Sequence, residues 1–145
     1  MDISIKKYKP AYRDSMIAIW EESVRATHYF LEREDIEFYK AQVNCIDFSS
    51  LDAYCAFEQG EMVGIMGVAE DKLEMLFLKP SSIGNGIGRM LMDFALNELA
   101  VNKVDVNEDN IHAVKFYERL GFKEYDRSSV DDNGKPYPII RMMLD

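Results

Sequence analysis

The stretch LFLKPSSIGNGIGRMLMDFAL, residues 76–96, places Gly84, Gly86 and Gly88 between an apolar run and a run with helical spacing. Glycine loses more backbone freedom on folding than any other residue, so three of them within five residues oppose folding. Backbone N–H groups at a helix N-terminus bind anions, and glycines let phosphate oxygens approach the backbone. We therefore interpret this strand, turn and helix as a phosphate-binding segment, with a tight turn that needs positive φ as the alternative.

The glycine spacing disfavours two nucleotide-binding patterns. The Walker pattern G-x-x-x-x-G-K-[ST] is absent, because no Lys-Ser or Lys-Thr pair follows Gly88. The dinucleotide pattern G-x-G-x-x-G requires a glycine at the position of Arg89. It also requires an N-terminal βαβ unit, whereas three antiparallel strands are predicted ahead of this stretch.

Composition predicts one soluble domain that spans residues 1–145. Apolar residues make up 48% of the 145 residues and aromatic residues 12%, which is typical of a globular chain. The net charge of −9 argues against nucleic-acid binding and suits a cationic partner such as an amine, although it also serves plain solubility. The N-terminus lacks the apolar core of a signal peptide and no apolar stretch reaches membrane length, so we expect a cytoplasmic protein without membrane contact.

The thiols and imidazoles are too few for a metal framework. Cys45 and Cys55 are the only cysteines and both lie among apolar residues, which predicts two buried free thiols and no disulfide. His28 and His112 are the only histidines, so no zinc-ligand spacing is present and no metal is expected.

Hydrophobic periodicity predicts eleven elements in the order β-α-α-β-β-β-α-β-α-β-β. Turn signals at Gln59-Gly60, Glu70-Asp71 and Asn133-Gly134 separate strands, and Asn110 and Gly121 bound the last helix. This order predicts an α/β domain with a mixed sheet, in which helix 86–100 links two parallel strands. The predicted strands are 3–8, 52–58, 62–69, 72–79, 103–107, 122–130 and 138–144, and the predicted helices are 12–27, 33–43, 86–100 and 110–120.

Two stretches resemble the motifs of a known superfamily. Residues 76–96 resemble motif A of the GNAT superfamily of acetyl-CoA-dependent N-acetyltransferases, whose signature is [Q/R]-x-x-G-x-[G/A]. NEDNIHAVKFYERLGF, residues 107–122, resembles motif B, in the right order and at the right separation. The resemblance implies the GNAT fold, a mostly antiparallel mixed sheet whose central parallel pair splays apart. IWEESVRATHYFL (19–31) and VDDNGKPYP (130–138) resemble, more narrowly, small bacterial members of the YjaB type that acetylate protein lysines.

The resemblance implies an acyltransferase that moves an acetyl group from acetyl-CoA to a primary amine by direct attack. The amine would be a small amine, a protein lysine or a protein N-terminus. Ile83 stands where the superfamily carries Gln or Arg, so a polar side chain is lost near the pyrophosphate, and Arg89 is positioned to supply a charge instead. The coenzyme-binding residues implied are Leu76, Phe77, Leu78, Ile83, Gly84, Asn85, Gly86, Ile87, Gly88, Arg89, Asn110 and Tyr117.

Tyr117 matches the superfamily tyrosine that protonates the leaving thiolate. Without the resemblance, its place on an apolar helix stripe favours a core aromatic. In the superfamily, a bulge in the strand that corresponds to residues 72–79 frees main-chain groups, so Leu76–Leu78 are expected to face the coenzyme and an oxyanion donor is implied near Leu78. Asn110 is expected both to cap its helix and to contact the coenzyme.

Several carboxylates are candidates for the general base that an amine with a pKa of about 10.4 requires. Asp105 occupies the position of the glutamate base in ribosomal-protein alanine acetyltransferases. Glu74 lies on the neighbouring strand, where strict alternation puts it on the same face as Leu76 and Leu78. Glu108 is a third candidate, and a water chain without a single base is a fourth possibility.

Two loops rich in acids and aromatics are predicted to hold the acceptor. His28 and Tyr29 lie in the first, and Asp131, Asp132 and Tyr137 in the second. Charge and ring faces suit a cationic amine there, although ordinary polar loops would look the same. A non-catalytic coenzyme A-binding module and a nucleotide-binding regulatory module remain the alternative functions, and the sequence leaves monomer and homodimer open.

Overall fold

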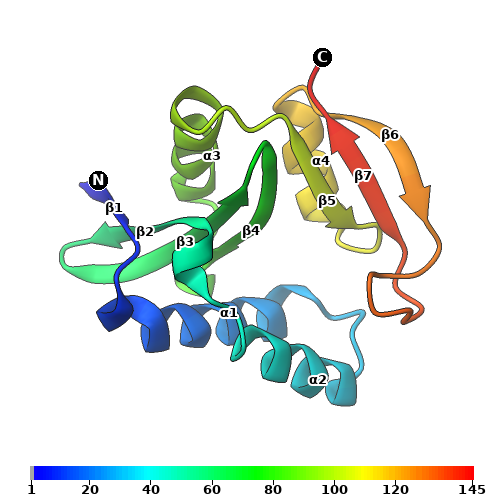
Figure 1. Cartoon of the computed structure of the whole chain (residues 1–145), viewed down its shortest axis with the longest axis horizontal. Coiled ribbons are helices and arrows are strands. Elements are labelled where there is room, and N and C mark those ends of the chain that lie inside the picture. Colours follow the sequence, from blue (N-terminus) through cyan, green and yellow to red (C-terminus); the bar gives the residue numbers. More distant parts are fainter. Residues whose placement is uncertain (1) are drawn as a thin grey trace.

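The computed structural model describes residues 2–145, which form one seven-stranded sheet with helices on both faces (Figure 1). The strand order is β1-β2-β3-β4-β5-β7-β6, and only β4 and β5 are parallel neighbours. The strands are β1 (Ile3–Lys7), β2 (Asp52–Glu58), β3 (Glu61–Ala69), β4 (Lys72–Leu78), β5 (Lys103–Asn107), β6 (Lys123–Ser128) and β7 (Ile139–Met143). The helices are α1 (Arg13–Thr27), α2 (Arg33–Val43), α3 (Ile87–Glu98) and α4 (Ile111–Arg119).

The predicted α/β architecture and element order are confirmed, and most boundaries lie within one or two residues of the prediction. Helix α3 ends at Glu98 rather than at residue 100, because Ala100 adopts a φ of 55° that a right-handed helix does not allow. The prediction of two buried thiols is wrong for Cys45. It follows the end of α2 and is exposed, whereas Cys55 lies within β2 and is buried.

Apolar side chains fill both faces of the sheet. One core lies against α3 and α4 and the other against α1 and α2. Strand β3 contributes to both cores because successive side chains alternate across the sheet: Met66 enters the first and Ile65 the second, and both are fully buried. The central strands are therefore fixed from two sides, and the elements that carry the two sequence motifs rest on a rigid support.

Strands β4 and β5 touch along only a short length. Their register contains two pairs, Lys72 with Lys103 and Leu73 with Val104, beyond which the strands diverge (Figure 1). The predicted splay of the central pair is thereby confirmed. A bulge accompanies it within the predicted strand 72–79. It lies at Glu74, because Gly67 pairs with Met75 while the next residue of β3 pairs with Leu73.

The three glycines of motif A have different structural tasks. Gly84 and Gly86 have φ values of +88° and +85°, a region in which a side chain is strained. Gly88 lies inside α3, where an added Cβ would meet Leu78 and Phe116 at 3.6 Å, an ordinary van der Waals distance. Two glycines thus shape the loop, and the third belongs to the helix that packs on the core.

This difference predicts opposite effects of two alanine substitutions on the free energy of unfolding. Gly86→Ala should lower it by about 1–2 kcal/mol, because Ala must adopt a left-handed backbone. Gly88→Ala should leave it unchanged or raise it by up to ~1 kcal/mol, since Ala favours a helix and its methyl group fits. Urea unfolding of both variants measures the difference, and a Gly88→Ala protein less stable than Gly86→Ala would contradict the assignment.

Candidate active site

The loop between β4 and α3 presents free backbone N–H groups at a helix N-terminus. Gly86 is the N-cap of α3, no side chain caps it, and no acidic residue lies in the first turn. The N–H groups of residues 87–89 therefore lack intrahelical partners. Those of Ile83 and Asn85 make only long bonds, to Pro80 O at 3.3 Å and Ser82 O at 3.4 Å.

The same loop is sterically open to a ligand. A Cβ placed on Gly84 or Gly86 would meet nothing within 4 Å, so a ligand can approach both residues closely. The positive end of the α3 dipole favours an anion there. Arg89 is 62% exposed and pairs with Asp93 at 3.1 Å, while Ile83 is 47% exposed and apolar. The segment therefore suits a phosphate group held chiefly by main-chain N–H groups.

Helix α4 begins with the predicted cap and carries a buried tyrosine. The Asn110 side chain accepts a hydrogen bond from Ala113 N at 3.3 Å. Tyr117 is only 7% exposed and packs between Phe116 and Phe122, with ring centroids 5.2 Å and 5.8 Å away. Burial raises the pKa of Tyr117 above its ordinary value, so the hydroxyl keeps its proton at neutral pH.

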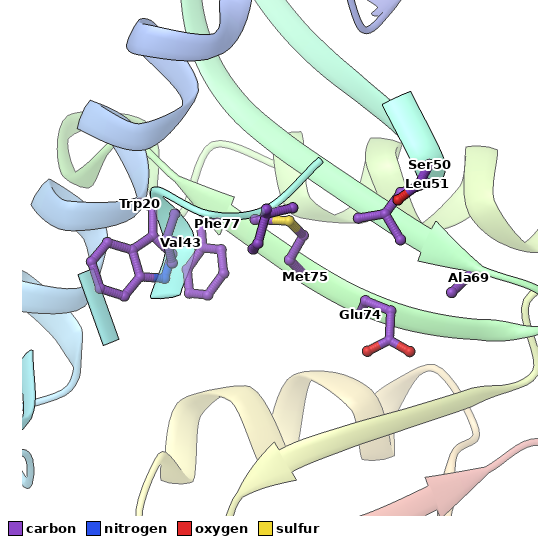
Figure 2. Close-up of a pocket in the computed structure, with 9 residues that line it drawn as sticks. Trp20, Val43, Ser50, Leu51, Ala69, Glu74, Met75 and Phe77 are labelled. Carbon is purple, nitrogen blue, oxygen red and sulfur yellow. The ribbon is translucent and has the colours of Figure 1, made fainter. Parts of the chain in front are cut away.

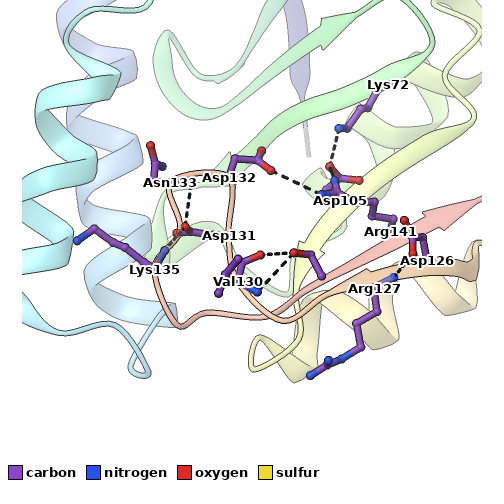
Figure 3. Close-up of polar contacts among 11 residues, drawn as sticks. Lys72, Asp105, Asp126, Arg127, Val130, Asp131, Asp132, Asn133, Lys135 and Arg141 are labelled. Carbon is purple, nitrogen blue, oxygen red and sulfur yellow. Dashed lines mark hydrogen bonds and ion pairs between the residues drawn. The ribbon is translucent and has the colours of Figure 1, made fainter.

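Asp105 lies between two cations, next to the two residue pairs that still join β4 and β5. We call this place the closed end of the splay. Asp105 Oδ2 is 2.5 Å from Lys72 Nζ on β4 and 2.6 Å from Arg141 on β7 (Figure 3). The other guanidinium nitrogen of Arg141 lies 3.6 Å from Asp132 Oδ1. Asp105 Oδ1 is buried and has no hydrogen-bond partner among residues 2–145. These ion pairs link β4, β5 and β7 at the point where β4 and β5 share few backbone hydrogen bonds.

Glu74 lies on a different face from the one predicted. Leu76 and Leu78 pack against the α3–α4 core, whereas Glu74 lines a pocket of about 450 Å³ on the α1–α2 face together with Met75 and Phe77 (Figure 2). The bulge is the cause, because its extra residue reverses the alternation of side chains. Glu74 is exposed and forms no ion pair among residues 2–145.

Residues 130–138, which we call the strap, cross from β6 to β7 and are fastened to α2. The Tyr137 hydroxyl donates to Asp35 and accepts from Glu32 N at 3.1 Å. The Asp131 carboxylate accepts from the Tyr39 hydroxyl. Two of the three predicted acceptor residues of the strap, Asp131 and Tyr137, are therefore engaged in holding it in place.

Further polar contacts of the strap involve residues that the sequence analysis missed. Lys135 Nζ lies 2.8 Å from Asp35 Oδ1 and 4.4 Å from the Phe38 ring centroid. The Asp131 Oδ1 also accepts from Asn133 N and Lys135 N, at 2.9 Å each. Partners about a hundred residues apart leave no signal in a single sequence. Asp132 differs from Asp131, because it is exposed and faces Arg141.

The first predicted acceptor loop brings His28 to the sheet and leaves Tyr29 outside. The His28 ring lies 5.3 Å from Phe30 and 6.3 Å from Phe77 on β4, and Phe30 in turn lies 6.2 Å from Tyr137. Tyr29 is 76% exposed. Glu108, the third base candidate, forms an ion pair with Arg127 at 2.5 Å on the far side of β5 from Glu74. His28, Phe77 and Tyr137 thus share one side of the splay.

Neither a metal-binding cluster nor a membrane-spanning helix occurs among residues 2–145. No group of three His, Cys, Asp or Glu side chains in this part of the chain is arranged to hold a metal ion. Within the same residues, no helix combines the length and the apolar character needed to cross a membrane.

The sequence profile of the acetyltransferase (GNAT) domain family matches residues 21–142. The chain therefore belongs to the GNAT family, and it is an acetyltransferase enzyme rather than a nucleotide-binding regulator. It is 37% identical to the peptidyl-lysine N-acetyltransferase YjaB of Salmonella typhimurium, over 99% of each chain. The YjaB of Escherichia coli is 36% identical, over 98% of this chain and 97% of that protein.

Solved structures agree with the assignment. The solution structure of apo YjaB from Escherichia coli superimposes with a TM-score of 0.88 and 35% identity, covering 99% of this chain and 98% of the other. The PaiA N-acetyltransferase of Thermoplasma acidophilum in complex with coenzyme A has a TM-score of 0.76 and 22% identity, over 99% and 100% of the chains. At that identity the second match supports the fold alone.

The charge arrangement around Asp105 predicts a stability difference between two Asp→Asn variants. Asp105→Asn should lower the free energy of unfolding by about 1–3 kcal/mol, because Lys72 and Arg141 would be left without their shared anion in a partly buried place. Asp93→Asn, which breaks the exposed pair with Arg89, should cost less than about 0.5 kcal/mol. Equal losses in urea unfolding would show that the Asp105 pairs do not stabilise the closed end of the splay.

Proposed function

We propose that this chain, folded as one domain over residues 1–145, transfers the acetyl group of acetyl-CoA to the side-chain amine of a peptide or protein lysine. The observation that carries the proposal is the open, positive-φ glycine loop at the start of α3, directly after the strand that separates from β5. An anion-binding helix start beside an opened sheet suits a ligand with a pyrophosphate and a long arm. When bound, acetyl-CoA supplies the activated acetyl thioester.

Main-chain groups would do most of the coenzyme binding. The N–H groups of residues 84 and 86–89 hold the pyrophosphate, and Ile83 contributes no polar side chain. Beyond Leu73, the β5-facing edge of β4 has no strand partner, although its other edge pairs with β3. The main-chain groups of Leu76–Leu78 that point to this free edge are therefore available to bond the coenzyme arm and to orient the acetyl carbonyl. Asn110 holds the start of α4 in place beside this edge.

Tyr117 acts as the general acid. Its hydroxyl is buried and protonated, and it projects from α4 into the core shared with Leu76 and Leu78. It donates its proton to the departing sulfur, and the raised pKa ensures that the proton is present throughout the neutral range.

Glu74 receives the amine proton, and Asp105 keeps the splay in shape. A carboxylate that lines a pocket and forms no ion pair is available to a cationic amine, whereas Asp105 Oδ2 is already shared by Lys72 and Arg141. The bulge places Glu74 next to Met75 and Phe77 on the α1–α2 face, opposite the α3–α4 core to which Tyr117 belongs. Acid and base therefore act from opposite sides of the sheet, the base on the amine and the acid on the departing sulfur.

The acceptor class follows from the pocket and from the relatives. Apolar walls, which include Trp20, Met75 and Phe77, suit the aliphatic stem of lysine, and the Glu74 carboxylate suits its ammonium group. The related YjaB proteins are named peptidyl-lysine N-acetyltransferases. The overall charge of −9 would favour an acceptor in a basic surrounding.

Coenzyme binding is tested most simply by thermal unfolding. Acetyl-CoA at 100 times its dissociation constant should stabilise the fold by about 2.7 kcal/mol and raise the melting temperature, since it binds only the folded state. NAD and ATP at the same concentration should have little effect, because the loop lacks their binding patterns. A melting temperature that acetyl-CoA does not change would refute the proposed function.

Replacement of Tyr117 by Phe should lower kcat by about 100-fold while the affinity for acetyl-CoA stays the same, because only the proton donor is lost. Release of free thiol at saturating amine measures turnover, and calorimetry measures affinity. Tyr125→Phe, at a tyrosine that is 49% exposed on β6, is the matched control and should retain wild-type turnover. An unchanged kcat in Tyr117→Phe would assign this tyrosine to packing alone.

Replacement of Glu74 by Gln should lower kcat/KM for the amine by about 100-fold at neutral pH. The defect should shrink as the pH approaches about 10.4, where a lysine amine loses its proton without help. Glu98→Gln, at an exposed carboxylate on α3, serves as the control. If Asp105→Asn instead shows the pH-dependent defect and Glu74→Gln does not, the roles of the two carboxylates are reversed.

A further inference from the structure

A row of rings crosses the acceptor side of the splay. Phe77 on β4 is followed by His28 and Phe30 from the segment between α1 and α2, and then by Tyr137 from the strap. His28 is the only one of the four residues whose ring contains nitrogen atoms. A ring nitrogen of His28 can therefore accept a hydrogen bond, which no ring atom of the other three can do.

Hydrogen bonds of the last turn of α1 determine which nitrogen of His28 carries the proton. The Thr27 hydroxyl lies 2.7 Å from Ser23 O, and a carbonyl oxygen can only accept, so the single hydroxyl proton is used there. Thr27 Oγ1 also lies 2.8 Å from His28 Nδ1 and has only lone pairs left to offer. Nδ1 must therefore be the donor, which leaves Nε2 with a free lone pair.

The surroundings keep this ring neutral. Burial lowers the pKa of His28 to about 4, because the charged form would lose its hydration next to Phe30 and Phe77. Nε2 has no hydrogen-bond partner among residues 2–145, whereas Nδ1 is paired with Thr27 Oγ1. A neutral imidazole with a free acceptor does not repel a cationic amine, whereas an imidazolium would.

We propose that His28 Nε2 accepts a hydrogen bond from an N–H of the acceptor amine and orients it toward β4, with Thr27 as the positioning residue that fixes the tautomer. This assignment rests on the proposed function, since it concerns the acceptor of that reaction. It adds a residue that orients an acceptor amine with at least two N–H groups, one for Nε2 and one for the base.

Three substitutions of His28 separate the acceptor atom from the ring packing. His28→Phe keeps a ring against Phe30 and Phe77 and should raise KM for the amine by about tenfold, the effect of one lost hydrogen bond, with acetyl-CoA affinity retained. His28→Gln puts an amide oxygen near the position of Nε2 and should stay closer to wild type than His28→Asn, which imitates Nδ1. An unchanged KM in His28→Phe, or an Asn variant as good as Gln, would overturn the assignment.

A measurement on the unaltered protein decides the same point without relying on variants or on turnover. ¹⁵N NMR of the His28 ring should show a protonated Nδ1 and an unprotonated Nε2, and addition of Nα-acetyl-lysine amide should shift the Nε2 resonance. Thr27→Val should weaken the preference for this tautomer. A protonated Nε2, or an Nε2 resonance that does not move at saturating amine, would overturn the proposal.

The two proposals fail in different ways. A protein that acetyl-CoA does not stabilise, or that acetylates no amine, would refute the proposed function, while the NMR titration would still decide whether His28 receives the amine. An active enzyme with an unresponsive Nε2 would refute the role of His28 alone.

Discussion

Two pairs of residues, Lys72 with Lys103 and Leu73 with Val104, make the whole backbone register between β4 and β5, and the site depends on this short contact. Past these pairs one edge of β4 has no neighbour, so its main-chain groups are left for a ligand. The bulge at Glu74 lies at the same point and turns a carboxylate toward the pocket on the α1–α2 face. The ion pairs of Asp105 with Lys72 and Arg141 link the strands at this point, where β4 and β5 have few backbone hydrogen bonds.

A second connection spans the open end of the splay. The strap belongs to the β5–β7 half of the sheet, yet it is bonded to α2, which packs on the β1–β4 half. The two halves are thus joined at the closed end by the Asp105 pairs and on the α1–α2 face by the strap and the row of rings. This explains why acidic and aromatic side chains gather there, and why several of them are bound to one another rather than free.

Local sequence patterns predicted the helices and strands, whereas contacts between distant residues determine how the side chains of the candidate site are arranged. Alternation, helical spacing and turn residues such as Gln59-Gly60 placed strands and helices to within a few residues, since these signals act over short distances. The prediction that Glu74 shares a face with Leu76 and Leu78 was wrong because of one bulge. A single extra residue in a strand reverses the face to which the neighbouring side chains point. The pairing of Asp35 with Tyr137 joins residues 102 positions apart and had no local signal. Asn110 and the glycine loop were predictable because caps and positive φ have specific residue preferences.

The central claim is that the free edge of β4 and the glycine loop together receive acetyl-CoA. Amide hydrogen exchange with and without acetyl-CoA tests this directly, because a bound ligand protects the backbone groups that it contacts. We predict slower exchange within residues 76–89, with unchanged exchange in the far strands β1 and β2. Unaltered exchange in residues 76–89, or protection confined to another part of the chain, would contradict it.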